Sequence, residues 1–500
     1  MLLRPQKNDY TIIGYYTGKI IVGIGLTMIV PLVTSLLFAE WDPALDFAIG
    51  ICVCLIVGLG LTMLCETDRD LLWMHGMVTA AFSWALATFL GAIPHYLSGH
   101  FLSYLDACFD IMSGYTTTGL VLIQDLDHVS HGLNMWRHLL TYLGGQGMIV
   151  VAITFLFKGT AGAYRLYVGE GKDERLMPNV VQTARAIWMI SLIYLAVGTA
   201  WLFVANLLAG MTPLRSLLHG LWIFMGSWST GGFAPQTQNL LYYHSPLVEL
   251  VTVIIFIIGS YNFALHYSVW QGNYHEIRRN IETVSFSTTV TITCVVSIIG
   301  LLQARFYPGF TALFRRCFYQ IVSAHTTTGN MTVYAMQFVN HWNILAAMGI
   351  MIAMSIGGSA CSTAGGIKGI RAGILFHALI NDIHRIFSPD SAVITRKFHH
   401  IRDVVLEDRH VRAAALITIS YMAMYLLGAV VGLFYGYPLL HSLFDSVSAG
   451  SNSGLSCGLT CASMPSVMKV VYIFMMWAGR LEFMSIFALL AFVWAQVKGR

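Results

Sequence analysis

Long apolar stretches separated by short polar connections run through almost the whole chain. Four shorter apolar pieces, near 104–114, 216–228, 312–324 and 440–450, each lead into Gly, Ser and Thr. A short helix followed by a polar loop is typical of a re-entrant membrane segment. A membrane-spanning helix needs about 20 mostly apolar residues. Stretches of that length lie approximately at 12–38, 45–65, 73–94, 135–157, 185–209, 247–269, 284–303, 342–367, 411–434 and 467–496. The pattern therefore predicts an all-α integral membrane protein with ten transmembrane helices.

After the first two predicted spans, the chain repeats one unit four times: a span, a short helix, a polar loop and a second span. We therefore expect a leading two-helix membrane segment at 1–70, followed by four pseudo-symmetric pore repeats around a central pore. The expected bounds of the repeats are 71–160, 183–270, 283–385 and 408–500. Repetition at the same topological place is a stronger signal than any one loop taken alone.

Each repeat carries a polar loop that reaches a glycine at the same position. The loops read Thr116-Thr117-Thr118-Gly119-Leu120, Ser229-Thr230-Gly231-Gly232-Phe233, Thr326-Thr327-Thr328-Gly329-Asn330 and Ser451-Asn452-Ser453-Gly454-Leu455. Aligned on their glycines, all four have a hydroxyl three residues earlier. Ten residues earlier, all four have an aromatic residue: Phe109, Trp222, Tyr319 and Phe444. One such loop would be an ordinary Gly/Thr turn, but four in register favour a shared function.

Cation chemistry gives these loops a purpose. A dehydrated cation needs oxygen ligands in place of water, and rings of backbone carbonyls supply them in K⁺ channels. Carbonyls line a pore when the backbone adopts unusual dihedrals, which glycine permits. The negative C-terminal end of each short helix would also face the ion. Hydroxyls before the glycine either add ligands or hold the loop. We predict K⁺ ligands at Thr117, Thr118, Thr230, Gly231, Thr327, Thr328, Asn452 and Ser453.

Composition agrees with a membrane protein. The chain is 56% hydrophobic and 10% charged, whereas a soluble domain is roughly 25% charged. A net charge of +4 without a long basic run gives no indication of nucleic acid as a partner. We interpret the nine cysteines as small apolar packing residues rather than disulfides or metal ligands. Cys457 and Cys461 lie near the fourth loop, without the neighbouring histidines or acids that would complete a metal site.

Lysine and arginine gather in alternate connections, which sets the expected orientation because cytoplasmic loops carry the excess of these residues. With the N-terminus in the cytoplasm, 368–412 and the other connections on that side hold most of the basic residues. The opposite side receives Arg137, Arg215, Arg305, Arg315, Arg316 and Lys469, together with many acids. Both termini are therefore expected in the cytoplasm, and the re-entrant pieces are expected to enter from outside.

Residues 357–366 are almost entirely Gly, Ala, Ser, Thr and Cys, and they interrupt an apolar stretch that begins near Trp342. Such a run has poor helix propensity. Irregular backbone at membrane depth is buried in protein or lines a cavity. A flexible constriction below the polar loops and a small-residue face for helix packing both fit this composition.

Three charged residues lie at membrane depth or near the loops. Arg480 falls in the last predicted span, where an unpartnered guanidinium costs about 3 kcal/mol or more. It either lies beside the ion path, pairs with Glu482, or reaches the membrane surface. Asp110 and Asp445 each lie nine residues before a loop glycine. They either raise the cation concentration at the pore mouth or anchor the short helices.

Together these features resemble the Trk/Ktr/HKT superfamily of potassium transporters, specifically its bacterial TrkH type, over nearly the whole chain. Three further motifs carry the resemblance: Gly144-Gly145-Gln146-Gly147, the segment 357–368, and Gly479-Arg480-Leu481-Glu482. The leading pair of spans favours the TrkH type over the shorter KtrB type. Asn330 departs from the family pattern, which more usually has an aromatic or aliphatic residue after the third loop glycine.

The resemblance implies potassium uptake across a bacterial cytoplasmic (inner) membrane, with K⁺ as the permeant ion and no organic cofactor in this chain. It implies a homodimer controlled by a cytoplasmic nucleotide-binding subunit of the TrkA type. No nucleotide-binding fingerprint is visible in this chain, so such control is expected to come from a partner. Symport with H⁺ or Na⁺ and channel-like conduction both fit. It also implies a gate formed by Gly357, Gly358, Ser359, Ser362, Thr363, Gly365, Gly366, Lys368 and Arg480.

Three other functions compete with potassium uptake. Gly454-Leu455-Ser456-Cys457-Gly458 matches the G-x-S-x-G pattern of hydrolases, but the nearest histidine, His441, precedes the short helix and no oxyanion hole is evident. A transporter of organic solutes usually shows two inverted halves, whereas these repeats share one topology. A Na⁺-permeable relative often has serine at the first loop glycine, where this chain keeps Gly119.

Overall fold

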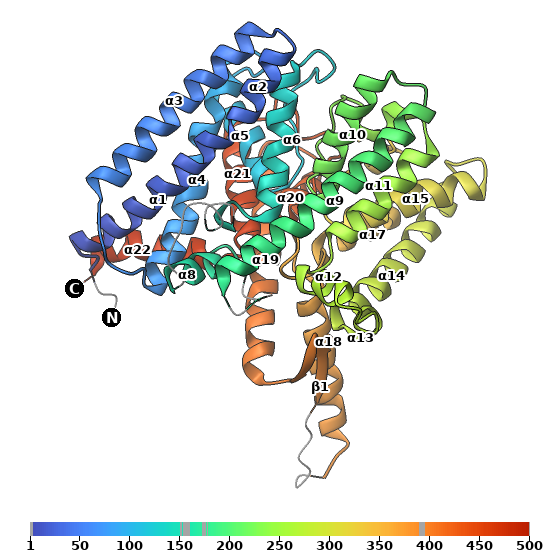
Figure 1. The fold of residues 1–500 in the computed structure, drawn as a ribbon. Helices are drawn as coiled ribbons and strands as arrows, with labels where there is room; N and C mark the ends of the chain where they lie inside the picture. Colours follow the sequence, from blue (N-terminus) through green and yellow to red (C-terminus); the bar gives the residue numbers. More distant parts are fainter. Residues whose placement is uncertain are drawn as a thin grey trace.

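Most of the chain that the structure describes is helical, in agreement with the predicted all-α class (Figure 1). The computed structural model describes residues 4–150, 153, 161–172, 177, 179–389 and 396–499. The chain begins with α1 (Lys7–Thr27), α2 (Ile29–Leu37) and α3 (Trp41–Leu64), which correspond to the first two predicted spans. Helix α1 packs against α3 and α4, and α2 packs against α6, so this leading segment lies against the first repeat.

Four units of long helix, short helix and second helix follow in sequence order. The first three consist of α4 (Trp73–Leu97), α5 (Tyr104–Tyr115) and α6 (His131–Gln146), then α9 (Val180–Leu208), α10 (Pro213–Trp228) and α11 (Pro246–Gly259), then α14 (Ile281–Ala304), α15 (Phe310–His325) and α17 (Ile344–Ile356). The fourth consists of α19 (Asp408–Phe434), α20 (Leu439–Ser451) and α21 (Ser466–Arg480). Side-chain oxygens of Ser103, Asn179 and Asn343 accept backbone N–H bonds at the starts of α5, α9 and α17, which explains where these helices begin.

The four units close into a ring. In each unit the second helix contacts the short helix of the next unit: α6 with α10, α11 with α15, α17 with α20, and α21 with α5. The last of these contacts joins the end of the chain to its first repeat. The short helices α5, α10, α15 and α20 therefore surround one central axis, with the longer helices outside them.

Smaller elements join these units. They are α8 (Ala161–Gly169), the 3₁₀ helix η1 (Asn239–Tyr243), α12 (Phe263–Trp270), α13 (Glu276–Arg279), α16 (Gln337–Asn340), α18 (Gly369–Ile386) and α22 (Met484–Lys498). Strands β1 (Lys397–His400) and β2 (Arg402–Val405) form an antiparallel hairpin in which Lys397 pairs with Val405 and His400 with Arg402. This hairpin is a difference from the all-α prediction, and in Figure 1 it lies beside α18, in the part of the chain that extends below the main helical body.

Two predicted spans are broken rather than continuous. Helices α11 and α12 meet at 98°, within the predicted span 247–269, and α21 and α22 meet at 114°, within 467–496. By length and composition, the described residues contain six helices able to cross a membrane, or up to eight if each bent pair counts as one span. The end of the predicted span 135–157, beyond residue 150, lies largely outside the described residues. The count of ten spans therefore stays a prediction.

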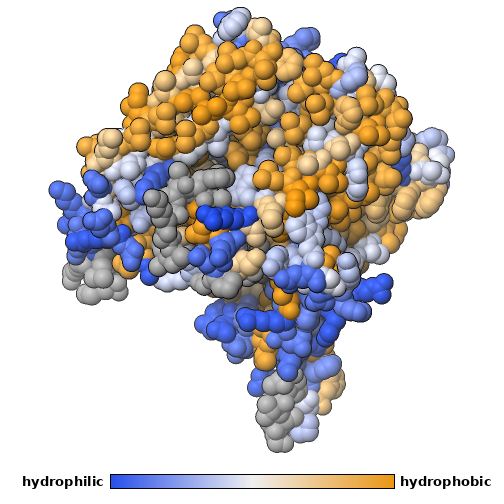
Figure 2. Space-filling view, in the orientation of Figure 1, coloured by the Kyte–Doolittle hydropathy of each residue, from blue (hydrophilic) through white to orange (hydrophobic). Residues whose placement is uncertain are grey.

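The outer surface is apolar where a soluble protein would be polar. Side chains such as Leu37, Leu64 and Phe434 are about four-fifths exposed or more, at 79%, 87% and 84%. Figure 2 shows apolar residues over most of the helical body, whereas polar residues gather around the hairpin and beside the two termini. Polar groups such as Thr117, Asn452 and Arg137 are buried inside instead. This inverted distribution is the one expected for a helical body surrounded by lipid.

Candidate functional site

The four short helices all end at the predicted loops, and all end in the same way. In each loop, the N–H of the residue before the glycine donates to the carbonyl five residues earlier. These bonds are Thr118 to Ser113 (2.8 Å), Gly231 to Gly226 (2.8 Å), Thr328 to Ser323 (2.8 Å) and Ser453 to Ser448 (2.9 Å). This is the longer hydrogen bond of the Schellman motif, which ends a helix through one left-handed residue. The repeat seen in the sequence is therefore also a repeat of backbone geometry.

The left-handed residue in each loop is not glycine. Thr117, Thr230, Thr327 and Asn452 have φ of +54°, +50°, +53° and +57°. A β-branched residue at positive φ is a genuine outlier, and each such conformation costs of order 1–3 kcal/mol. The threonine hydroxyls offset part of this cost: those of Thr117 and Thr230 donate to the preceding carbonyls at 2.7 Å. Strain repeated at four equivalent positions indicates a functional site.

The glycines bring the loops into contact. Gly119, Gly232, Gly329 and Gly454 have φ of +90°, +60°, +79° and +79°. A Cβ on each would lie within 3.0 Å of the carbonyl oxygen that precedes the next loop's glycine, a separation that real Cβ atoms essentially never show. The facing oxygens are those of Gly231, Thr328, Ser453 and Thr118, in that order. The sequence of contacts returns to its start, so the four loops form a closed ring.

The first hydroxyl of each loop holds the loop to its own helix, which was one of the two predicted roles. Thr116 Oγ1 donates to the Met112 carbonyl at 2.7 Å, and Thr326 Oγ1 to the Val322 carbonyl at 2.8 Å. Ser229 Oγ makes the equivalent bond in the second loop. These oxygens therefore stabilise the helix ends.

Two asparagines connect neighbouring loops. Asn452 Nδ2 donates to Thr118 Oγ1 at 2.9 Å, which joins the fourth loop to the first. Asn330 Nδ2 donates to Ser227 Oγ at 2.9 Å, which joins the third loop to α10. Asn330 is 2% exposed. The departure from the family pattern at this position is thus accommodated by a buried hydrogen bond.

Residues 357–368, between α17 and α18, lie directly against the ring. Thr363 Oγ1 is 3.2 Å from Thr230 Oγ1, and the Gly365 N–H donates to Thr327 Oγ1 at 2.7 Å. Thr117 Oγ1 is 3.5 Å from the Thr363 carbonyl, and a Cβ on Gly365 would collide with the Ser451 carbonyl. One segment thus contacts all four loops, and a helix-packing face does not explain that arrangement.

Polar contacts hold this segment from the other side. The Ala360 N–H donates to the buried Glu282 carboxylate at 2.6 Å, and the Ser359 N–H donates to the Ser260 carbonyl at 3.0 Å. The Lys368 ammonium turns back to the Ala364 carbonyl within the segment. These anchors lie on α14 and at the break between α11 and α12, so that break serves to position the segment.

Arg480 lies at the end of α21, at the bend before α22, rather than within a continuous span. Its guanidinium donates to the carbonyls of Thr363 at 2.8 Å, Gly144 at 2.6 Å and Gly145 at 3.2 Å. Glu482 takes Arg371 as its ion partner. The alternative in which Arg480 pairs with Glu482 is therefore not the one found, because the two side chains bind different partners on either side of the bend. Arg480 instead joins the segment 357–368 to the Gly144-Gly145 motif.

A cavity of about 1040 Å³ opens on the hairpin side of this segment. Ala360 of the segment, Arg371, Glu482 and hairpin residues from His400 to Arg402 line it. Ala360 thus borders this cavity, while Thr363 and Gly365 of the same segment contact the loops.

The two aspartates near the loops are structural anchors. Asp110 is fully buried and lies 3.1 Å from Arg137 Nε and 3.2 Å from His95 Nε2. Asp445, also fully buried, accepts bonds from the Cys457 and Thr460 backbone N–H groups at 2.8 and 2.9 Å. Both carboxylates are buried and bound by groups of the protein itself, which supports the anchoring interpretation.

The serine of the G-x-S-x-G pattern belongs to the same anchor. Ser456 Oγ donates to Asp445 at 2.9 Å, and the Gly458 N–H donates to Ser456 Oγ at 2.9 Å. These bonds explain why serine and glycine occur here, without any catalytic role. None of the nine cysteines forms a disulfide, and the described residues hold no cluster of three or more His, Cys, Asp or Glu side chains that could bind a metal.

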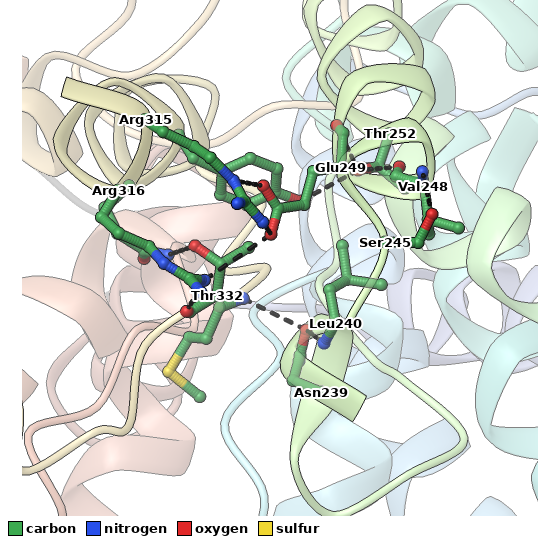
Figure 3. Close-up of polar contacts among 12 residues, drawn as sticks. Asn239, Leu240, Ser245, Val248, Glu249, Thr252, Arg315, Arg316 and Thr332 are labelled. Carbon is green, nitrogen blue, oxygen red and sulfur yellow. Dashed lines mark hydrogen bonds and ion pairs between the residues drawn. The ribbon is translucent and has the colours of Figure 1, made fainter. Parts of the chain in front are cut away.

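Sequence reasoning missed an ion-pair cluster near the starts of α11 and α15 (Figure 3). Arg315 on α15 binds both oxygens of Glu249 on α11 at 2.7 Å, and Arg316 Nη1 lies 3.6 Å from the same carboxylate. Arg316 also donates to the Thr332 carbonyl, just beyond the third loop. The charge pattern predicts the same side of the membrane for these residues, but residues 66 positions apart show no spacing that would reveal a pair.

A ring of four re-entrant loops inside an apolar helical shell defines a membrane transport protein of the pore-loop class. The profile of the TrkH family, described as a cation transport protein, matches residues 44–307 and 309–496. The chain belongs to the TrkH family of cation transport proteins, and this confirms the resemblance seen in the sequence. This assignment excludes the hydrolase alternative, because the family transports cations.

Relatives cover almost the whole chain. An uncharacterised cation transporter from Methanocaldococcus jannaschii is 32% identical over 98% of this chain and 97% of its own length. The Trk system potassium uptake protein TrkH of Halomonas elongata is 27% identical over 94% and 96%. The crystal structure of the potassium transporter TrkH from Vibrio parahaemolyticus superposes with a TM-score of 0.81 at 25% identity, over 96% of this chain and 98% of that one.

Proposed function

We propose that this protein takes up K⁺ through a pathway at the centre of the four-loop ring. The closed ring carries the proposal, because each loop presents a carbonyl oxygen against the glycine of its neighbour. The Trk names of two similar proteins agree with K⁺ as the permeant ion. K⁺ is the cargo in this scheme, and no organic cofactor is required of this chain.

The proposed ligands are oxygen atoms of the two residues that precede each loop glycine. They are Thr117 and Thr118, Thr230 and Gly231, Thr327 and Thr328, and Asn452 and Ser453. Carbonyls replace the water shell of K⁺ only if their spacing is held. Left-handed backbone at four positions and glycine contacts between loops are features that hold it.

The proposed gate is the segment 357–368 together with Arg480. Thr363 and Gly365 contact the loops and Ala360 borders the cavity, so an ion that passes from the ring to the cavity meets this segment. Arg480 adds a positive charge beside that position and bonds the segment through the Thr363 carbonyl. Conduction requires this segment to move aside.

The relatives named Trk system proteins suggest further assembly. We propose a homodimer in the cytoplasmic membrane, with both termini and the hairpin inside the cell, and control by a nucleotide-binding subunit of the TrkA type. The polar hairpin and the basic residues on that face support this orientation. Blue-native electrophoresis of the purified protein tests the dimer, and antibody access to a C-terminal tag in intact and opened cells tests the orientation.

Ion flux into proteoliposomes tests the K⁺ function directly. Vesicles holding the protein should take up K⁺ and Rb⁺ well ahead of Na⁺. Gly119 has the widest of the four ring contacts, 2.5 Å from a new Cβ to the Gly231 oxygen. Gly119→Ser is therefore the mildest of the four glycine substitutions, and it should shift the first loop and admit Na⁺ at the expense of K⁺ selectivity. Gly60, which has open space around its Cβ position, provides the control variant Gly60→Ser.

Each result bears on one part of the proposal. Equal Na⁺ and K⁺ flux in the unmodified protein would favour the Na⁺-permeable alternative. A permeability ratio unchanged in Gly119→Ser would remove Gly119 from the filter. A change shared by Gly60→Ser would indicate a general effect on the membrane body.

A further inference from the structure

Asn239 occupies a special position just beyond the second loop. It begins η1, has φ of +52°, and is half-buried. Asparagine tolerates this left-handed backbone better than most residues. Its side-chain amide makes three hydrogen bonds. Nδ2 donates to the Gly232 carbonyl at 3.1 Å, while Oδ1 accepts from the Met331 N–H at 3.1 Å and the Leu240 N–H at 2.8 Å. Figure 3 shows Asn239 beside Leu240.

The partners fix the orientation of the amide. A carbonyl needs a donor, and two N–H groups need an acceptor, so one end must be NH₂ and the other oxygen. Gly232 is the loop glycine of repeat two, and Met331 follows the loop glycine of repeat three by two residues. Asn239 therefore joins the outer ends of two neighbouring loops with a single side chain.

The second loop differs from the other three at the point where Asn239 binds. Its glycine has φ of +60°, against +79° to +90° for the others. The Phe233 N–H donates to the Gly231 carbonyl at 2.8 Å. A bond over two residues with positive φ at the centre is the rare and strained form of the γ-turn. The Asn239 amide holds the carbonyl of the central residue of that turn.

The third loop is held from both sides at its exit. Asn239 binds the Met331 N–H, while Arg316 donates to the next carbonyl, that of Thr332, and Gln320 Nε2 donates to Thr332 Oγ1 at 3.1 Å. Arg316 is in turn tied to Glu249. The chain of contacts from Glu249 to Gly232 thus passes through Asn239.

We propose that Asn239 is a positioning residue for ion selectivity, which rests on the proposed K⁺ filter. It keeps the second loop in its strained turn, so that the Gly231 carbonyl engages the Phe233 N–H and the outer filter is asymmetric. Without the amide donor, the Gly232 peptide is free to turn. The turn then relaxes, and oxygens near the outer ion site change their spacing.

Asn239→Asp keeps the shape, the tolerance of positive φ and the acceptor, and replaces the donor with a charged acceptor oxygen that repels the Gly232 carbonyl. Asn239→Gly keeps the backbone conformation and removes all three bonds. The matched control is Asn343→Asp, since Asn343 also donates through Nδ2, to Gln303 at 3.0 Å, and accepts from the Leu345 N–H at 3.2 Å. Asn343 caps α17, away from the loops.

K⁺, Rb⁺ and Na⁺ permeability ratios are measured in proteoliposomes, together with thermal stability of the detergent-purified protein. Asn239→Asp should change the Na⁺/K⁺ ratio by about fivefold, the effect of losing roughly one hydrogen bond, while its stability stays close to that of Asn343→Asp. Asn239→Gly should change the ratio at least as much.

The outcomes separate the two proposals. Wild-type ratios in both Asn239 variants, measured in the folded fraction even if stability falls, would overturn the role of Asn239. An unmodified protein without preference for K⁺ would instead overturn the K⁺ filter itself. An equal change in Asn343→Asp would show a general effect of the added carboxylate and would also overturn the role.

Discussion

Arg480 shows how one side chain links charge with mechanical restraint. Its guanidinium is nearly buried and bonds three carbonyls, from the Gly144-Gly145 motif and from Thr363. Two unit charges about 6 Å apart repel by roughly 3 kcal/mol at an effective dielectric near 20. That is enough to form a barrier for K⁺ without forbidding passage.

Arg480→Ala and Arg480→Gln should therefore both increase K⁺ flux, because they remove the charge and release the Thr363 carbonyl. Arg480→Lys should keep much of the restriction if charge dominates. Fluorescence-based K⁺ flux in proteoliposomes provides the measurement. If Lys behaves like Ala in well-folded protein, the planar contact to three carbonyls is the better account. If all three variants only lose expression, Arg480 is a structural residue.

At the residue scale, the sequence predicts the features that recur in all four repeats and misses the contacts that occur once. The loop glycines and the hydroxyls before them could be found because they recur four times. The partners of Arg480 could not, because Thr363 and Gly144 lie 117 and 336 residues away in sequence. Glu482, only two residues away, was the nearest candidate and the wrong one. Asp110 was correctly weighed as an anchor, yet its partners Arg137 and His95 carry no pattern.

Shortening the segment 357–368 tests the element proposed as the gate. Deletion of 360–364 removes Thr363 and the Ala360 contact to Glu282, so the barrier on the cavity side should disappear. K⁺ flux should rise while the K⁺/Na⁺ ratio stays that of the unmodified protein, since Gly119 and its equivalents are untouched. Vesicle flux at matched protein density measures both. A folded deletion protein that conducts no faster would reject the gate, and a lost ratio would show that the segment also supports the filter.

The β1–β2 hairpin is a second element whose attachment can be tested, through pH. His399 Nδ1 lies 2.6 Å from Asp403 and Nε2 lies 2.9 Å from Glu276 on α13. Hydrogen bonds to Asp403 and then Glu276 raise the pKa of His399 above its ordinary value of 6.5. The attachment is therefore fully stabilised below the ordinary pKa and loses this contribution as pH rises through the raised pKa.

Amide protection of 396–407, followed by hydrogen exchange, should fall relative to a His399→Gln variant as pH rises above about 6.5. At the acid end, the hydrogen bond from His399 lowers the pKa of Asp403, so the pair should persist until pH falls through that lowered value. Protection that follows the same curve in both proteins would show that His399 does not control the attachment.

At the element scale, long apolar periods predict helices well and predict breaks poorly. The break before α12 and the bend before α22 interrupt stretches that remain apolar on both sides. At the bend before α22, Glu482 and Phe483 adopt φ of +50° and +67°. Neither residue is a glycine or proline, so the sequence gives no local signal of the bend. The segment 357–366 could be predicted because its many glycines indicate irregular backbone. The hairpin was missed because two four-residue strands are too short for a period of two to stand out.

At the scale of the whole molecule, the ring of contacts closes inside one chain. Helix α21 of the fourth repeat packs on α5 of the first, and the Thr118 carbonyl faces Gly454. Asp106 on α5 and Lys469 on α21 reinforce that closure with a buried ion pair at 2.6 Å. The predicted fourfold arrangement needed only sequence order, whereas the closure depends on contacts between the two ends of the chain.

Closure within one chain predicts that each copy in the proposed dimer conducts by itself. A variant such as Gly329→Val should block its own ring, because a side chain there collides with the Ser453 carbonyl. When unmodified and blocked chains are mixed and reconstituted as dimers, K⁺ flux should fall in proportion to the blocked fraction. Flux through a pathway shared between copies would fall more steeply, roughly with the square of the unmodified fraction, since one blocked chain would close it.

The blocked variant must match the unmodified protein in size-exclusion profile and thermal stability for the comparison. A steep decline under those conditions would mean that the ion path runs between chains, and the ring described here would then have a structural role.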